Sequence, residues 1–96
     1  MPSPDPAARG VVRLLNTSGG GVLVLAGEVD GTVVESFHRR YGREPARVAG
    51  IDAGSVTSLS AAGLELLRDH LDAARWSGRT VTLRQAPEVE RLLAGR

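Results

Sequence analysis

The fold is decided at residues 22–30, which read VLVLAGEVD. The first half of this stretch is apolar and partly β-branched, which favours a strand, and residues 27–30 end that strand. Asp30 suits the N-cap of a helix, because its carboxylate can accept free N–H groups of the first turn. The apolar side chains that follow share one helical face: Val33, Val34, Phe37 and Tyr41. A strand therefore leads directly into an amphipathic helix, which Gly42 and Pro45 end.

Another strand precedes this unit, at residues 11–15. The residues between the two strands, 16–21, read NTSGGG, which is typical of a turn, so we expect a β-hairpin. A phosphate-binding loop is the other interpretation of these glycines. A G-x-G-x-x-G pattern that begins at Gly19 would need glycine where Val24 stands, so the flexible turn is preferred. Residues 1–10 contain three of the five prolines and are expected to form a flexible tail.

Another strand–helix unit follows the first helix. Residues 47–52 predict a short strand that ends at Asp52, and a loop over residues 53–59 leads to Ser60. Ser60 suits the N-cap of a long helix that Gly78 ends. The apolar face of this helix contains Leu64, Leu67, Leu71 and Ala74, flanked by Leu66 and His70. Trp76, near the helix end, is expected at the rim of the core, and an exposed binding platform is the alternative.

A last strand is predicted at residues 80–83, and Pro87 suits the first position of a last helix that ends at Gly95. The elements alternate as strand–strand–helix–strand–helix–strand–helix. This order predicts an α/β fold with a single mixed, mostly parallel four-stranded sheet packed with helices, in which the hairpin supplies an antiparallel edge. We expect one domain over residues 11–96, since no repeat or linker marks a second one.

Composition excludes several classes of function. The 96 residues include no cysteine and no lysine, and 12 basic residues interleave with 11 acidic ones. These absences exclude thiolate catalysis, disulfides, a Schiff-base lysine and a P-loop lysine. No basic stripe with aromatic side chains occurs, so nucleic-acid binding is not expected. His38 and His70 have no ligand-type residue at i+3 or i+4, and no G-x-S-x-G motif occurs. We therefore expect no metal, no cofactor and no catalytic residue.

Membrane insertion is not expected either. The longest apolar stretch, residues 22–26, is far shorter than the roughly 20 residues that a membrane-spanning helix needs. The N-terminus has no basic start followed by an apolar stretch, so we expect no signal peptide. These features predict a cytoplasmic domain.

A small basic cluster lies near the end of the first predicted helix. It consists of His38, Arg39, Arg40 and Arg43. Cations at this position stabilise the negative end of the helix dipole, which accounts for the cluster without further function. The alternative is a docking face for an acidic partner.

Several segments, in this order and spacing, carry a family resemblance. Residues 27–30 read GEVD, residues 48–52 and 56–59 read VAGID and VTSL, and residues 86–93 read APEVERLL. They resemble the G-E-[LIV]-D strand end, the strand and loop before the active loop, and the S-P-x-V-x-R-x-L helix of the STAS family. This family is the domain of anti-sigma factor antagonists and of sulfate-transporter tails. The resemblance covers about residues 11–95 and implies the same fold and a partner-binding surface.

The regulatory loop departs from the family pattern. In the family a D-S-[SA]-G loop precedes the long helix, and a partner kinase phosphorylates its serine. Aligned on Gly63, this chain has Ser60, Ala61 and Ala62 in the three preceding positions. Because Ala61 has no hydroxyl, it cannot accept a phosphoryl group. The resemblance therefore implies a non-enzymatic module for an anti-sigma factor or serine-kinase-type partner that is not switched at position 61.

The resemblance also implies which residues meet the partner. They lie in the loop and at the ends of the adjoining strands: Asp30, Asp52, Ser58, Ser60, Ala61, Ala62 and Gly63. Plain structural roles stay open beside this one, namely helix caps at Asp30 and Ser60 and a turn at Asp52. Several alternatives stay open. The chain could be phosphorylated at Ser60 or Ser58 instead, or it could form a weak homodimer. It could also be a subunit of a lipid or solute transport ATPase assembly, or a small enzyme or nucleotide sensor.

Overall fold

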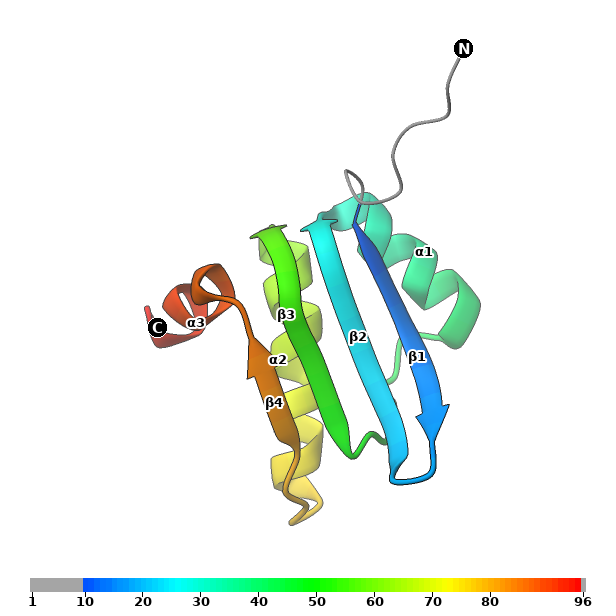
Figure 1. Cartoon of the computed structure of the whole chain (residues 1–96). Helices are drawn as coiled ribbons and strands as arrows, with labels where there is room; N and C mark the ends of the chain where they lie inside the picture. The colour runs from blue at the N-terminus through cyan, green and yellow to red at the C-terminus, as the bar shows by residue number, and fades with distance from the viewer. Residues whose placement is uncertain (1–9, 96) are drawn as a thin grey trace.

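The computed structural model describes residues 10–95, so most of the tail predicted at residues 1–10 lies outside the described residues. The elements along the chain are β1 (Val11–Thr17), β2 (Gly20–Val29), α1 (Gly31–Tyr41), β3 (Gly50–Leu59), α2 (Ala61–Trp76), β4 (Thr82–Gln85) and α3 (Pro87–Ala94) (Figure 1). This arrangement confirms the predicted α/β class and the predicted order of strands and helices.

The strands form one mixed sheet in the order β1-β2-β3-β4. β1 and β2 are antiparallel, whereas β2, β3 and β4 are parallel neighbours. Because the order is sequential, right-handed crossovers place α1 and α2 on the same face of the sheet. Figure 1 shows both helices behind the strands, with α3 at the β4 side.

The core lies between the sheet and these helices. β2 and β3 contribute inward side chains at matching heights, since Leu23 pairs in register with Ile51. The buried apolar residues are Val12, Leu23, Leu25, Val29, Val34, Phe37, Val48, Ile51, Ala53, Val56, Leu66, Leu67, Ala74 and Val89. On α2 the buried face includes Leu66 and His70, whereas Leu64 and Leu71 are half-buried. The helix is therefore rotated slightly from the face predicted by its leucines.

β3 differs most from the sequence prediction. The strand does not end at Asp52; it continues through the predicted loop to Leu59. The small and polar residues of this segment favour a loop locally, but parallel pairing with β2 over Gly50–Leu59 and burial of Ala53 and Val56 hold it extended. β4 likewise occupies Thr82–Gln85, two residues later than predicted.

The helix boundaries follow the predicted caps and stops. Asp30 and Ser60 are the N-caps of α1 and α2, Gly42 follows α1, and Pro87 begins α3. Trp76 does not lie at the rim of the core: it ends α2 with 88% of its surface exposed. Among the helices that the structure describes, none combines the length and the apolar character needed to cross a bilayer.

His70 is a buried polar residue that joins distant parts of the fold. Only 2% of its surface is exposed. Its Nε2 accepts the Ala46 N–H at 3.0 Å, and its Nδ1 donates to the Leu66 carbonyl at 2.9 Å, which fixes the neutral Nδ1–H tautomer. Burial lowers the pKa of His70 below 6.5, although the Leu66 carbonyl and Asp69 act in the opposite direction. His70 thereby ties the connection between α1 and β3 to α2.

Candidate functional site

Two helix N-termini meet at one edge of the sheet. β2 ends at Val29 and β3 ends at Leu59, and these two residues are paired in register. The backbone N–H of Ser60 donates to the Val29 carbonyl at 2.9 Å, which joins the two strand ends directly. Asp30 and Ser60 each follow one of these strand ends. We call the surface formed by Asp30, Ser58, Ser60, Ala61 and Ala62 the double-cap edge.

Side-chain caps satisfy both helix starts. Asp30 Oδ1 accepts the Val33 N–H at 3.0 Å, and Ser60 Oγ accepts the Gly63 N–H at 3.3 Å. Both predicted capping roles are therefore confirmed. Ala61 is the first residue of α2 and its methyl group is exposed. The edge thus presents a capped helix start with a small apolar surface beside two carboxyl-bearing positions, Glu28 and Asp30.

Gly63 lets the first turn of α2 lie against the end of β2. It is buried, and a Cβ atom at this position would lie 2.7 Å from Leu59 Cδ1 and 3.0 Å from both Val29 Cγ1 and the Val29 carbonyl oxygen. Such distances are well below ordinary carbon contacts, so a side chain here would force the helix and the strand apart. Close packing against Leu59 and Val29 therefore explains why glycine occupies position 63, the position on which the loop was aligned.

Asp52 does not belong to the double-cap edge. It lies near the beginning of β3, paired in register with Val24 on one side and Arg84 on the other. Its carboxylate accepts the Gly54 N–H at 3.0 Å. Leu59 lies seven positions after Asp52 along extended chain, or about 23 Å away. The prediction that Asp52 ends a strand beside the Ser60 loop is wrong, because β3 continues past it.

The double-cap edge has an acidic and hydroxyl character. Ser58 is exposed and pairs in register with Glu28 of β2. His70 is engaged inside the core, and His38 lies on α1 beside Arg43. Within residues 10–95, no three His, Asp or Glu side chains converge as a metal site would require.

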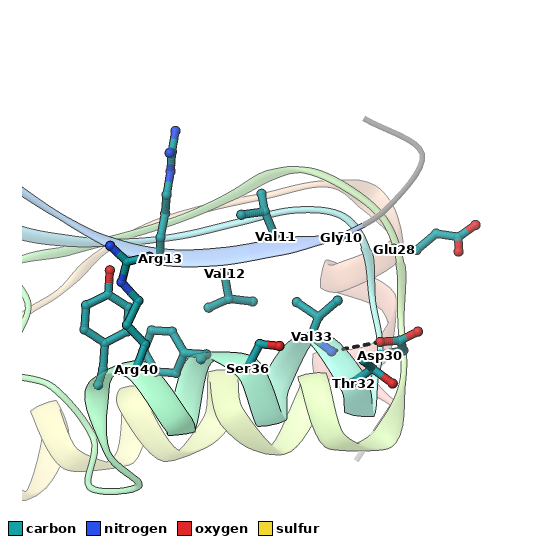
Figure 2. A pocket seen from close by; sticks show the side chains of 12 residues that line it. Gly10, Val11, Val12, Arg13, Glu28, Asp30, Thr32, Val33, Ser36 and Arg40 are labelled. Carbon is teal, nitrogen blue, oxygen red and sulfur yellow. Dashed lines mark hydrogen bonds between the residues drawn. The ribbon is translucent and has the colours of Figure 1, made fainter. Parts of the chain in front are cut away.

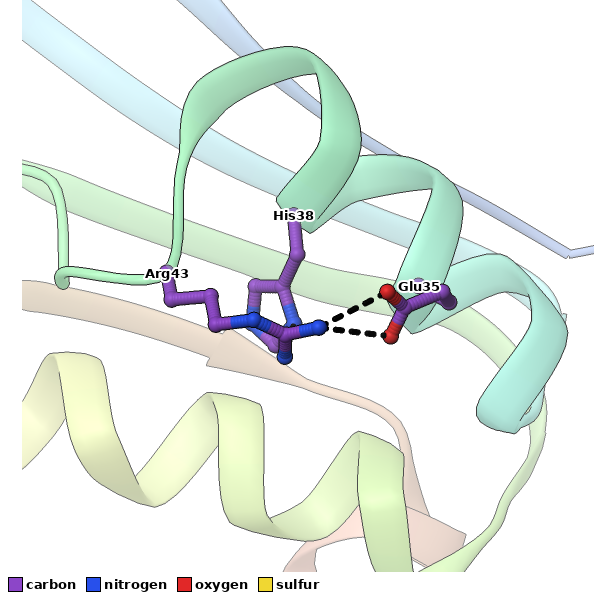
Figure 3. A network of polar contacts seen from close by, with 3 residues as sticks. All are labelled: Glu35, His38 and Arg43. Atoms are coloured by element: carbon purple, nitrogen blue, oxygen red, sulfur yellow. Dashed lines mark hydrogen bonds and ion pairs between the residues drawn. The ribbon is translucent and has the colours of Figure 1, made fainter.

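Part of the predicted basic cluster has a structural role. Arg43 Nη2 lies 3.2 and 2.8 Å from the two carboxylate oxygens of Glu35, and Arg43 Nη1 lies 3.3 Å from His38 Nδ1 (Figure 3). These contacts fold the residues after α1 back onto the helix. Arg40 belongs to a different surface, where its guanidinium lies 5.6 Å from the centre of the Tyr41 ring.

A groove between β1 and α1 was not predicted from the sequence. It has a volume of about 650 Å³ and is lined from both elements (Figure 2). Its polar and charged lining residues are Arg13, Glu28, Asp30, Thr32, Ser36, Arg40 and Tyr41. Of these residues, Arg40 belongs to the basic cluster for which the sequence leaves open a docking role, and nothing local in the sequence indicates that the two elements lie side by side.

We expect removal of the Ser60 cap to weaken the start of α2. Ser60→Ala leaves the Gly63 N–H without its side-chain acceptor, which should lower the free energy of unfolding by about 1 kcal/mol. Ser60→Asp retains a capping oxygen and should cost less than half of this. Urea unfolding of the three proteins measures both values, and equal losses in the two variants would contradict the capping role.

Comparison with protein-family models, with curated proteins and with solved structures found no match to this chain. The resemblance to the STAS family therefore rests on the quoted residues. For function, the geometry of the double-cap edge carries the argument.

Proposed function

We propose that this chain is a non-enzymatic, STAS-like module that binds a protein partner through the double-cap edge. The partner is an anti-sigma factor or a related serine-kinase-type protein, and the role is regulation of a bacterial sigma factor in the cytoplasm. With Ala61 at the start of α2, binding at this edge stays insensitive to phosphorylation at that position.

One observation carries this proposal. The contact from the Ser60 N–H to the Val29 carbonyl, at 2.9 Å, brings the capped starts of α1 and α2 to the same edge. That contact gives a partner one continuous surface, built by two strand ends and two helix starts. The surface is rigid, because Gly63 packs directly against Val29 and Leu59 beneath it.

The chemistry of position 61 explains why its side chain matters. A phosphate there would add about −1.5 to −2 charges and three acceptor oxygens at the start of α2. Asp30 already caps α1 at the same edge, so the added charge would change the surface that a partner meets. A methyl group keeps this surface unchanged in the presence of a kinase and ATP.

The remaining hydroxyls of the edge differ in accessibility. Ser60 Oγ accepts the Gly63 N–H, and Ser60 is only partly exposed. Ser58 is exposed on β3. If a kinase acts on this edge as it stands, Ser58 is therefore the hydroxyl that it would reach first.

Ala61→Ser tests the proposal directly. The partner is captured from native cytoplasm on the immobilised chain, purified, and mixed with wild type or variant in the presence of ATP and Mg²⁺. We expect Ala61→Ser, but not wild type, to gain about 80 Da by intact mass and to lose affinity for the partner by about tenfold or more. Ala62→Ser is the matched control, since it adds the same hydroxyl one residue further along α2 and should remain unmodified.

Three results would contradict the proposal. Phosphate on the wild-type chain at Ser58 or Ser60 would overturn the unswitched role. Capture of a transport ATPase with a membrane subunit would replace the sigma-regulatory role by the transport-associated one. A partner footprint that leaves Asp30, Ser60 and Ala61 unprotected in hydrogen exchange would remove the double-cap edge as the binding surface.

A further inference from the structure

Among residues 10–95, β1 is an edge strand, and none of these residues pairs with its outer side. It pairs with β2 alone, at one end of the sheet order. Thr17 and Gly20 flank a two-residue turn, and the two residues that flank such a turn form a hydrogen-bonded pair. Hydrogen-bonded and non-hydrogen-bonded pairs then alternate along the two strands. In the non-hydrogen-bonded pairs the backbone groups of β1 point away from β2. The backbone groups of Val12 and Leu14 therefore point outward, where a further strand could pair with them.

The groove described above runs along this open side. In Figure 2 Val12 points from β1 toward α1, while Val33, Ser36 and Arg40 point from α1 toward β1. From Asp30 to Arg40, α1 advances ten residues, or about 15 Å, which matches four to five residues of an extended peptide. An added strand would thus have outward backbone groups of β1 on one side and the surface of α1 beneath it.

The two ends of the groove carry opposite charge. Glu28 and Asp30 lie at the end where β1 begins. Arg13 and Arg40 lie further along, Arg13 pointing away from α1 and Arg40 pointing up from it (Figure 2). A strand that pairs with the outer side of β1 would therefore have Arg13 near one of its faces and Arg40 near the other. Both guanidinium groups would lie near the same point along its length. Acidic side chains at that height complement both.

We propose that this groove binds an extended peptide segment of another protein, which adds to the sheet beside β1. The segment is acidic at the end beside Arg13 and Arg40, and basic or neutral at the end beside Glu28 and Asp30. Backbone pairing with Val12 and Leu14 supplies affinity for any extended segment, and the charge gradient selects its sequence and direction. This inference does not depend on the role of Ala61.

A second copy of the chain fits the groove less well than a single strand. α1 extends past the outer side of β1 in Figure 1. In an antiparallel pairing of two β1 strands, both α1 helices would lie on the same face of the joined sheet and would compete for the space beside β1. A lone extended segment has no such helix.

The test uses short synthetic peptides with an alternating valine and threonine centre, acidic residues at one end and lysines at the other, made in both sequence orders. We expect one order to slow amide exchange of Val12 and Leu14 by about tenfold or more at saturation, because these N–H groups become paired. The same peptide with proline at its centre should leave that exchange unchanged.

Charge reversal supplies the matched comparison. Arg40→Glu should weaken binding of the favoured peptide by about tenfold or more, whereas Arg39→Glu, which makes the same change one residue away and outside the groove, should alter it less than about twofold. A peptide with lysines in place of its acidic end should bind Arg40→Glu better than wild type. The proposal is overturned if neither peptide order changes the exchange of Val12 and Leu14 at about 1 mM, if the two charge reversals have equal effects, or if the chain dimerises along β1 without peptide.

Discussion

Replacement of His70 by alanine is expected to lower the free energy of unfolding by about 3 kcal/mol. Two losses add: the imidazole leaves a cavity beside Phe37, whose ring lies 6.2 Å away, and the Ala46 N–H loses its acceptor inside the protein. Urea unfolding with a constant m-value measures the loss. His38→Ala is the matched control, because its imidazole is partly exposed on α1, and it should cost less than about 0.5 kcal/mol. Similar losses in both variants would contradict the anchoring role of His70.

The same residue makes stability depend on pH. The pKa of His70 is lowered by burial, so near and below pH 6.5 the unfolded chain binds a proton that the folded chain resists. The contribution of neutral His70 is complete above pH 6.5 and is lost as the pH falls below it, by up to about 1.4 kcal/mol per pH unit. His70→Gln retains a donor and an acceptor but does not titrate, so it should flatten this decline. A decline unchanged in His70→Gln would assign the acid sensitivity to other groups.

Gly63→Val is expected to cost about 2–3 kcal/mol, because its β carbon would be forced onto Leu59 and onto the Val29 backbone. The damage should concentrate at the double-cap edge, since the first turn of α2 must move away from β2. Thermal and urea unfolding measure the cost, and amide exchange at Ser60 and Gly63 locates it.

Gly31→Val is the matched control for this change. Gly31 also begins a helix beside the same edge, but a Cβ there meets nothing within 4 Å. Its substitution should stay within about 0.5 kcal/mol of wild type. Equal costs at the two glycines would show that the loss comes from helix-start chemistry rather than from contact with Val29 and Leu59.

The parts of the fold that depend on local chemistry could be predicted from the sequence. Asp30 and Ser60 were expected as caps because each is a short polar residue between a strand pattern and a helix pattern, and each makes its capping hydrogen bond. The hairpin was predictable from the glycine-rich turn in the same way. These features involve residues within a few positions of one another.

The parts that depend on distant contacts could not be predicted. The second half of β3 is extended because β2 pairs with it, although Gly54 and Ser55 favour a loop. The sequence predicts His70 beside the leucine face of its helix, but no local pattern indicates its hydrogen bond with Ala46, which lies 24 residues away. The groove is likewise absent from any local pattern, since it requires β1 and α1 to lie together. Position 61 could be interpreted only through a family resemblance.

The outer side of β3 is covered partly by a strand and partly by a helix. β4 pairs with β3 only from Gly50 to Ala53, and the Ala86 N–H closes this ladder on the Ala53 carbonyl at 3.1 Å. α3 takes over beside the rest of β3 and inserts Val89, which is fully buried. A helix of eight residues has little stability of its own, so it stays in place only through such packing. Transient undocking of α3 would therefore expose the unpaired backbone N–H and C=O groups along the second half of β3. Other chains could pair with these groups, so the packing of α3 should reduce aggregation.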